Sequence, residues 1–246
     1  MTTVRDVYDF LDGIAPFASQ EPWDNSGLQA GDRDAQVRRA MVSLDASPEV
    51  IGQAAAFGAQ LLVSHHPVLF RARKQLLADD PAWLLARHGI AAIASHTPAD
   101  AMPGGVNDVL AERLGLQISG VLREVIRLCR LPAPMTAADL AALIAQKLET
   151  KARFCNSEKM ISTVALCGGA GCHLLEEIYG RADAFITGDA DHHAFLEARQ
   201  HSLSLIAAGH YETEIHIVSV LLGLLREVFP RVEWRAAQER NAIQYT

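Results

Sequence analysis

The stretch VRRAMVSLDASPEVIGQAAAFGAQLLVSHHP, residues 37–67, decides the fold class. It opens with an apolar run typical of a strand, and Ser47 with Pro48 is typical of a helix N-cap followed by the first helical residue. The predicted helix ends at Gly58, and residues 60–63 form a second predicted strand. A strand, a helix and a strand in this order predict an α/β fold whose parallel or mixed sheet carries helices on its faces.

The same alternation continues toward the C-terminus. A helix is predicted from Pro81, and a strand follows over residues 90–94. In the second half, predicted helices alternate with predicted strands over residues 125–131, 161–166, 184–187 and 203–207. We therefore expect two α/β lobes with mixed sheets flanked by helices, residues 1–120 and residues 121–246, with a crevice between them.

Composition narrows the class of protein. Half of the 246 residues are hydrophobic, which is enough to bury a large core, and the formal net charge is −7. A negative chain without a long basic run makes nucleic acid an unlikely partner. No stretch is long and apolar enough to span a membrane, and the N-terminal residues form no apolar signal segment. The four cysteines form no C-x-x-C pair, which favours free thiols in a reducing compartment. The expected location is cytoplasmic.

Three segments that follow predicted strands carry side chains that metals prefer. They are SHHP at residues 64–67, HTPAD at residues 96–100 and GHYETE at residues 209–214. In open α/β sheets, ligands bind beyond the carboxyl ends of strands. Imidazole nitrogen together with carboxylate oxygen suits divalent transition metals. The candidate metal ligands are therefore His65, His66, Asp100, His210 and Glu214.

Each candidate in the first lobe has an alternative role. His65 and His66 face opposite sides of a regular strand, so both can bind one metal cluster only if Pro67 turns the chain. The alternative is a hydrogen-bonded pair at a partly exposed strand end. Asp100 is either a hard, charged metal ligand or a turn residue. His96 is a candidate either for supporting the ligands or for general acid/base catalysis.

The second lobe offers a helical pair of ligands. His210 and Glu214 are four residues apart on a long predicted helix, which places both on one face. The alternative is a solvated helix start, where acidic side chains favourably meet the helix dipole. His192, a second candidate for proton transfer, belongs to GDADHH at residues 188–193, which either lines the site or starts a helix. The glycine-rich turn at residues 168–171 lacks the Lys-Ser/Thr of a P-loop and is expected to be a tight turn.

Taken together, these motifs resemble the NIF3-like, or DUF34, family of dinuclear-metal proteins. The resemblance covers nearly the whole chain and also includes WDNSGL at residues 23–28, SLD at 43–45, GGVND at 104–108, CGGAG at 167–171 and TGD at 187–189. It implies two α/β lobes, a pair of metal ions in the crevice and a ring-like homohexamer. By position, the family's ligands fall on His65, His66, Asp100, His210 and Glu214. The family usually has Asn-Leu where this chain has Pro98-Ala99, which changes a pocket wall rather than the metal ligands.

Two functional hypotheses follow. The first is a metal-dependent hydrolase that acts on a small phosphorylated or cyclic-amide, nucleotide-like substrate. Two ions about 3.5–4 Å apart would share a bridging water, with Glu214 as the bridging carboxylate and His96 or His192 moving protons. Mixed nitrogen and oxygen ligands suit Zn, Fe, Mn or Ni.

The second hypothesis is a non-catalytic regulatory or scaffold protein that stores or senses metal and binds a protein partner. Five protein ligands on two ions leave coordination positions open, which favours catalysis because structural metal sites tend to be closed. Members of the family also carry the label of GTP cyclohydrolase 1 type 2 homologues, although nothing in this sequence indicates a guanine or triphosphate pocket.

Overall fold

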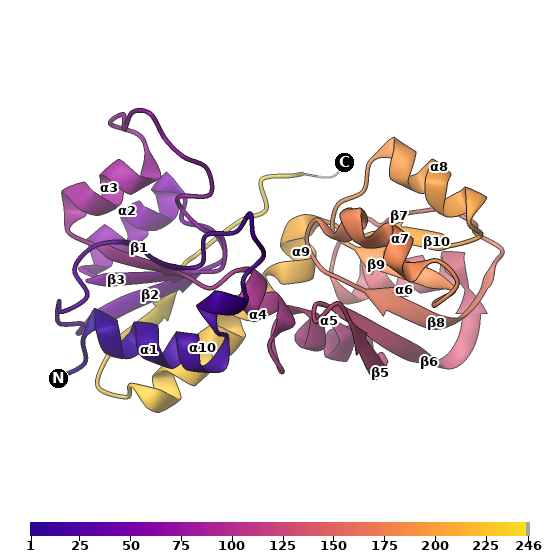
Figure 1. Ribbon diagram of the computed structural model, residues 1–246, viewed down its shortest axis with the longest axis horizontal. Coiled ribbons are helices and arrows are strands. Elements are labelled where there is room, and N and C mark those ends of the chain that lie inside the picture. The colour runs from indigo at the N-terminus through magenta and orange to yellow at the C-terminus, as the bar shows by residue number, and fades with distance from the viewer. Residues whose placement is uncertain (245–246) are drawn as a thin grey trace. The chain divides into compact units, whose positions relative to one another are not determined.

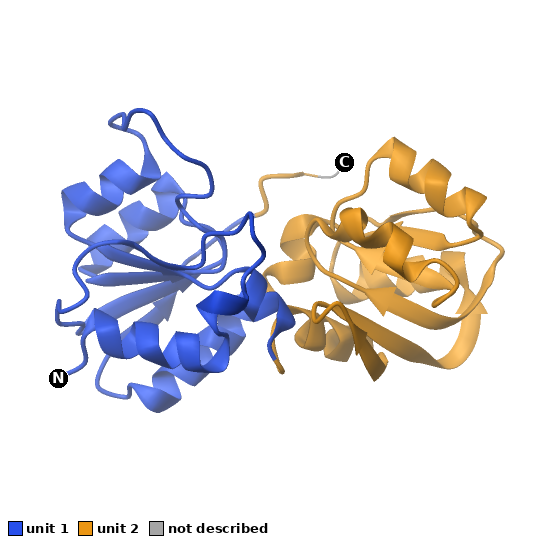
Figure 2. Cartoon of the chain, in the orientation of Figure 1, with its two compact units in different colours: residues 1–102, 217–240 blue, residues 103–216, 241–246 orange. Residues whose placement is uncertain are grey.

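Two α/β units make up the chain, and the structure, a computed structural model, describes residues 1–244 of it (Figures 1 and 2). Unit 1 contains residues 1–102 and 217–240, and unit 2 contains residues 103–216 and the segment that begins at Asn241. This division differs from the single boundary expected near residue 120. It differs because the C-terminal segment returns to the first sheet, so the chain crosses from one unit to the other three times.

Unit 1 is built on a five-stranded mixed sheet with the strand order β1-β4-β3-β2-β11. The central strands β2, β3 and β4 are parallel to one another, and β11 is parallel to β2 at one edge. Strand β1 is antiparallel to β4 at the other edge. Their bounds are β1 Gly27–Ala30, β2 Arg39–Ser43, β3 Leu61–Ser64, β4 Ala91–Ala94 and β11 Glu233–Ala236.

Helices cover both faces of this sheet (Figure 1). Helices α2 and α3 lie on one face, and α1 and α10 lie on the other. Their bounds are α1 Val4–Ile14, α2 Pro48–Phe57, α3 Pro81–His88 and α10 His216–Val228. The predicted start of α2 is confirmed, because the Ser47 side chain accepts a hydrogen bond from the backbone N–H of Val50.

Unit 2 is built on a six-stranded mixed sheet with the order β5-β6-β8-β9-β10-β7. Strands β8, β9 and β10 are parallel, and the other pairings are antiparallel. The strand bounds are β5 Gln117–Leu122, β6 Ile126–Thr136, β7 Arg153–Phe154, β8 Met160–Leu166, β9 Ala184–Thr187 and β10 Ser204–Ala207. The helix bounds are α5 Val106–Leu114, α6 Ala137–Lys147, α7 Leu175–Ile178, α8 His192–Gln200 and α9 His210–Glu214.

Side chains from this second sheet enter two separate cores. Successive residues of a strand point to opposite faces, so Val164 packs with α5 and α6 while Ala165 packs with α7 and α8. Ile186 and Phe185 of β9 divide between the two cores in the same way. Strands that bury both faces read as continuous apolar runs, which is why these segments were recognisable in the sequence.

The long helix expected to carry His210 and Glu214 is two helices. Helix α9 ends at Glu214 and α10 begins at His216. The Thr213 hydroxyl donates to the carbonyl groups of Gly209 and His210, and such local bonds compete with regular helix geometry. Among residues 1–244, no helix combines the length and the apolar character needed to cross a membrane. The four cysteines are free thiols, as predicted.

Candidate metal centre

The candidate ligands of unit 1 follow two neighbouring parallel strands. His65 and His66 come directly after β3, and His96 comes two residues after β4. Ser64 at the end of β3 pairs with Ala94 at the end of β4, so these strands end at the same level. The carboxyl ends of parallel strands share one edge of the sheet, which brings the three imidazole rings together.

His65 is completely buried, and one of its ring nitrogens is committed to the backbone. Its Nδ1 donates to the carbonyl oxygen of Ser95 over 2.8 Å. A carbonyl oxygen only accepts hydrogen bonds, so the proton of a neutral imidazole sits on Nδ1 and the lone pair on Nε2. Nε2 lies 3.6 Å from Oδ1 of Asp100. Asp100, for which a turn was the alternative, lies in the short helix α4 (Thr97–Ala101), which has Pro98 in its first turn.

The other two imidazole rings of this edge are held in the same manner. Nδ1 of His66 lies 2.8 Å from Oδ1 of Asp45, and Nδ1 of His96 lies 2.8 Å from Oδ1 of Asp24. A histidine that binds metal through Nε2 usually gives its other ring N–H to a carboxylate or a carbonyl group. All three histidines of this edge have that arrangement.

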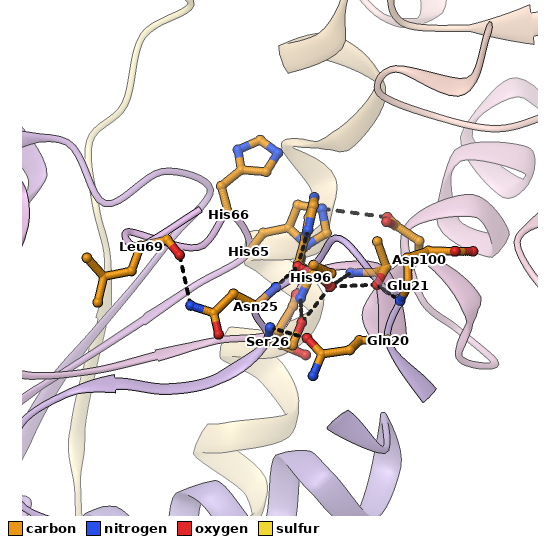
Figure 3. Close-up of polar contacts among 12 residues, drawn as sticks. Gln20, Glu21, Asn25, Ser26, His65, His66, Leu69, His96 and Asp100 are labelled. Atoms are coloured by element: carbon orange, nitrogen blue, oxygen red, sulfur yellow. Dashed lines mark hydrogen bonds and ion pairs between the residues drawn. The ribbon is translucent and has the colours of Figure 1, made fainter. Parts of the chain in front are cut away.

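The three rings converge, as Figure 3 shows. One ring nitrogen from each of His65, His66 and His96 lies within 4.8 Å of the others. The ring of His96 is 5.2 Å from that of His65 and 5.5 Å from that of His66, measured between centroids. The structure therefore brings together four of the residues singled out from the sequence, because Asp100 lies against His65.

Both carboxylate oxygens of Asp24 take part in hydrogen bonds. Its side chain is fully buried, and Oδ2 accepts hydrogen bonds from the Ser26 hydroxyl and from the backbone N–H of Thr97. Burial raises the pKa of this carboxyl, but hydrogen bonds from His96 and Thr97 outweigh burial and hold the pKa well below its usual value. Asp24 is therefore ionised at neutral pH and stabilises positive charge on the His96 ring.

Replacing Asp45 by alanine tests the orientation of His66. Without its Oδ1 acceptor, the His66 ring loses the bond that fixes its tautomer and direction, so metal affinity should fall about 10–100-fold. Calorimetric titration of metal-free protein with Zn²⁺ measures this. Asp34→Ala is the matched control, because Asp34 is an exposed aspartate of the same unit that pairs with Arg5. Equal affinity in both variants would contradict this role of Asp45.

In unit 2, His210 and Glu214 lie on α9 with the spacing predicted from the sequence. Nε2 of His210 is 3.1 Å from Oε2 of Glu214. Nδ1 of His210 is 2.7 Å from Oδ2 of Asp189, which repeats the arrangement seen in unit 1. Glu214 is buried, with 5% of its side chain exposed. The expected one-face pairing is confirmed, and the solvated helix start does not describe Glu214.

A glycine turn makes room for this pair. Gly169 has a positive φ of 60°, and a Cβ added there would overlap Oε1 of Glu214 and come within 3.3 Å of Nε2 of His210. The turn at residues 168–171 is tight, as predicted, and the missing side chain of Gly169 leaves room for the Glu214 carboxylate. The backbone N–H of Gly169 donates to the Thr213 hydroxyl, which anchors the turn to α9.

Comparison with known proteins shows the family of this chain. Residues 2–242 match the family described as Duf34/NIF3 (NGG1p interacting factor 3). The chain belongs to the Duf34/NIF3 family. A relative from Streptomyces coelicolor is 32% identical, with 95% of this chain and 89% of the relative covered. A relative from Campylobacter jejuni is 32% identical, with 92% of each covered. Both carry the name GTP cyclohydrolase 1 type 2 homolog.

Solved structures of similar proteins have the same fold. A Staphylococcus aureus protein is 26% identical and superimposes with a TM-score of 0.89, with 100% of this chain and 99% of that chain covered. A Thermus thermophilus protein is 26% identical with a TM-score of 0.85, covering 98% and 100%. A Bacillus cereus protein related to NIF3 is 19% identical with a TM-score of 0.89, covering 100% and 99%. The expected Duf34/NIF3 architecture of two mixed sheets flanked by helices is thus confirmed.

His192 lies elsewhere in unit 2. It is exposed at the start of α8, the helix start that was the alternative for residues 188–193, and Asp191 is the N-cap. His192 lines a groove with Phe195 and Arg199, and neither His210 nor Glu214 lines that groove. A role for His192 in proton transfer stays a prediction.

Sequence reasoning missed the carboxylates that hold the rings. These carboxylates lie in three motifs of the family resemblance: Asp24 in WDNSGL, Asp45 in SLD and Asp189 in TGD. The histidine that each one contacts is 72, 21 and 21 residues away in the chain, respectively. It also missed Glu239, whose carboxylate accepts the backbone N–H groups of Leu44 and Asp45. Burial raises the pKa of Glu239. The available signal was that each aspartate lies in a motif next to a strand, which does not identify its histidine partner.

Proposed function

We propose that this chain binds two divalent metal ions through His65, His66, Asp100, His210 and Glu214. With metal bound, it hydrolyses a small phosphorylated or cyclic-amide, nucleotide-like substrate. The observation that carries the proposal is the state of four imidazole rings, those of His65, His66, His96 and His210. Each has Nδ1 at 2.7–2.8 Å from an oxygen acceptor, so Nε2 is the ring nitrogen that would bind a metal or exchange a proton.

The donor set fits a divalent transition metal. Neutral imidazoles contribute nitrogen and no charge, while Asp100 and Glu214 contribute oxygen and negative charge. Burying an ionised carboxylate such as that of Glu214 is unfavourable unless positive charge compensates it, and a divalent cation does so. Zn, Fe, Mn and Ni all suit this mixture of ligands, so the choice among them requires metal analysis.

The residues around the ligands suit proton transfer. Bound ions would supply Lewis acidity and lower the pKa of water toward neutrality. His96 presents Nε2 to the same cluster as His65 and His66, and the ionised Asp24 stabilises the imidazolium that forms when His96 takes up a proton. An imidazole oriented by a buried carboxylate is an arrangement that general acid/base catalysis uses. His96 is therefore the proposed proton carrier, and His192 is the second candidate.

The test is turnover by metal-reconstituted protein. Metal-free protein is loaded with Zn, Mn, Fe or Ni and assayed against phosphomonoesters, nucleotides and cyclic amides. We expect hydrolysis that a chelator abolishes and that returned metal restores. His96→Asn should keep its metal and lose most of its turnover. Tight metal binding without turnover on any substrate, together with binding of a protein partner, would instead support the regulatory or scaffold function.

Two further parts of the proposal rest on the family. The name of the curated relatives supports the nucleotide-like part of the proposed substrate class. A ring-like homohexamer in the cytoplasm is the proposed assembly and location. Light scattering of the purified protein would measure the assembly directly, and a mass far from that of six chains would contradict it.

A further inference from the structure

A pocket of about 510 Å³ lies in unit 1 beside His96. Its walls come from the turn that carries Trp23 and Asp24 and from the loop that carries Phe70 and Arg71. The pocket shares Asp24 with the proposed proton carrier, because the same carboxylate holds Nδ1 of His96. The pocket therefore adjoins the residue that orients the proposed proton carrier.

Two large aromatic side chains stand exposed at this pocket. Trp23 is 51% exposed and Phe70 is 43% exposed. Their rings meet edge to face with centroids 5.8 Å apart, and the ring of His96 lies 5.8 Å from Trp23 and 6.0 Å from Phe70. Two neighbouring exposed aromatic side chains are unfavourable in water, and aromatic faces bind other planar rings well.

Hydrogen bonds between the two segments shape the pocket. The Asn25 side-chain amide donates to the carbonyl group of Leu69 over 2.8 Å, and the backbone N–H of Leu69 donates to Gln29 over 3.0 Å. Both bonds tie Leu69, next to Phe70, to the segment that follows Trp23. The aromatic pair is therefore held in place rather than carried on an isolated loop.

The pocket also carries positive charge. Arg73 pairs with Asp80 and donates to the carbonyl group of Val68, so it fixes the loop. Arg71 lines the pocket and, within the described part of the chain, forms no ion pair. An exposed guanidinium beside two aromatic rings matches a ligand that has both a planar ring and an anionic group.

We propose that this pocket binds the aromatic ring of the substrate against Trp23 and Phe70, with an anionic group of the substrate at Arg71. The inference rests on the proposed function, because it assigns the substrate subsite of the same centre. It narrows the substrate to a planar aromatic compound that carries a phosphate or a carboxylate. A nucleotide and a simpler aromatic phosphate share this chemistry.

Calorimetry with three probes tests the subsite in zinc-loaded protein. GMP and phenyl phosphate carry a ring and a phosphate, and ribose 5-phosphate lacks the ring. We expect Trp23→Ala to weaken binding of at least one ring-bearing probe about tenfold and to leave binding of ribose 5-phosphate unchanged. Trp23→Phe should restore most of the affinity, and Arg71→Ala should weaken all three probes. Tighter binding of GMP than of phenyl phosphate would identify a nucleotide as the ligand class.

Trp83→Ala is the matched control, because Trp83 lies on α3 outside the pocket and is 44% exposed. The inference is overturned if neither ring-bearing probe binds, or if Trp23→Ala binds both as tightly as the unmodified chain. It is also overturned if Trp83→Ala causes an equal loss. Metal content is measured in every sample, because a chain that binds no zinc contradicts the proposed function, whereas a zinc-loaded chain without ring-dependent binding contradicts only the subsite.

Discussion

Glu214→Ala is expected to lower bound metal from two ions to well below two per chain. Glu214 supplies a buried carboxylate 3.1 Å from Nε2 of His210, and its removal takes away both a ligand and a compensating negative charge. If Glu214 bridges the two ions, occupancy falls below one. Elemental analysis of protein purified without added metal, and again after dialysis against Zn²⁺, measures the stoichiometry.

Two comparisons make this result specific. Glu214→Gln keeps the shape of the side chain and removes its charge, so it should also lose metal. Glu227→Ala, an exposed glutamate on α10, should keep the full amount. His65→Ala should cause a loss as large as Glu214→Ala if both units serve one pair of ions, and full occupancy in either variant would exclude that residue as a ligand.

Gly169→Ala should have the second largest effect, because it adds one carbon where Glu214 lies. The new Cβ would overlap Oε1 of Glu214 and crowd His210, so the carboxylate must move away from its position on α9. We expect metal affinity to fall by more than about tenfold, in line with the cost of disturbing a ligand's support. Zinc titration of the metal-free variant checks this.

Gly180→Ala separates crowding from backbone strain. Gly180 has a φ of 73°, close to that of Gly169, but an added Cβ there meets no atom within 4 Å. Both variants should lose about 1–2 kcal/mol of unfolding free energy, because alanine is unfavourable in the left-handed conformation. Only Gly169→Ala should lose metal, and an equal loss in Gly180→Ala would attribute the effect to strain.

The elements that could be predicted are those whose signals are local. Two adjacent residues, Ser47 and Pro48, mark the start of α2. The continuous apolar runs of β3, β4 and β9 reflect burial on both faces of the sheet. Helix α1 also has a local signal in the sequence. Thr3 and Asp6 form a capping box, visible in the sequence as a threonine with an acidic residue three positions later.

The features that could not be predicted depend on partners far away in the chain. Strand β11 is only four residues long, and its pairing with β2 joins positions about 190 residues apart. The candidate metal ligands could be predicted because imidazole and carboxylate side chains are the groups that divalent transition metals prefer. The contacts that orient them were not, because an aspartate in a turn carries no sign of which histidine it will meet.

The pairing of β11 with β2 has a consequence for synthesis on the ribosome. The sheet of unit 1 is completed only when β11, residues 233–236, has emerged, whereas residues 103–216 of unit 2 are continuous and emerge earlier. Domains generally fold as units during translation, so unit 2 can fold before unit 1 is complete. Until β11 is synthesised, the edge of β2 that it will cover stays unpaired. A nascent chain cut short before residue 233 would expose that edge and be prone to aggregation.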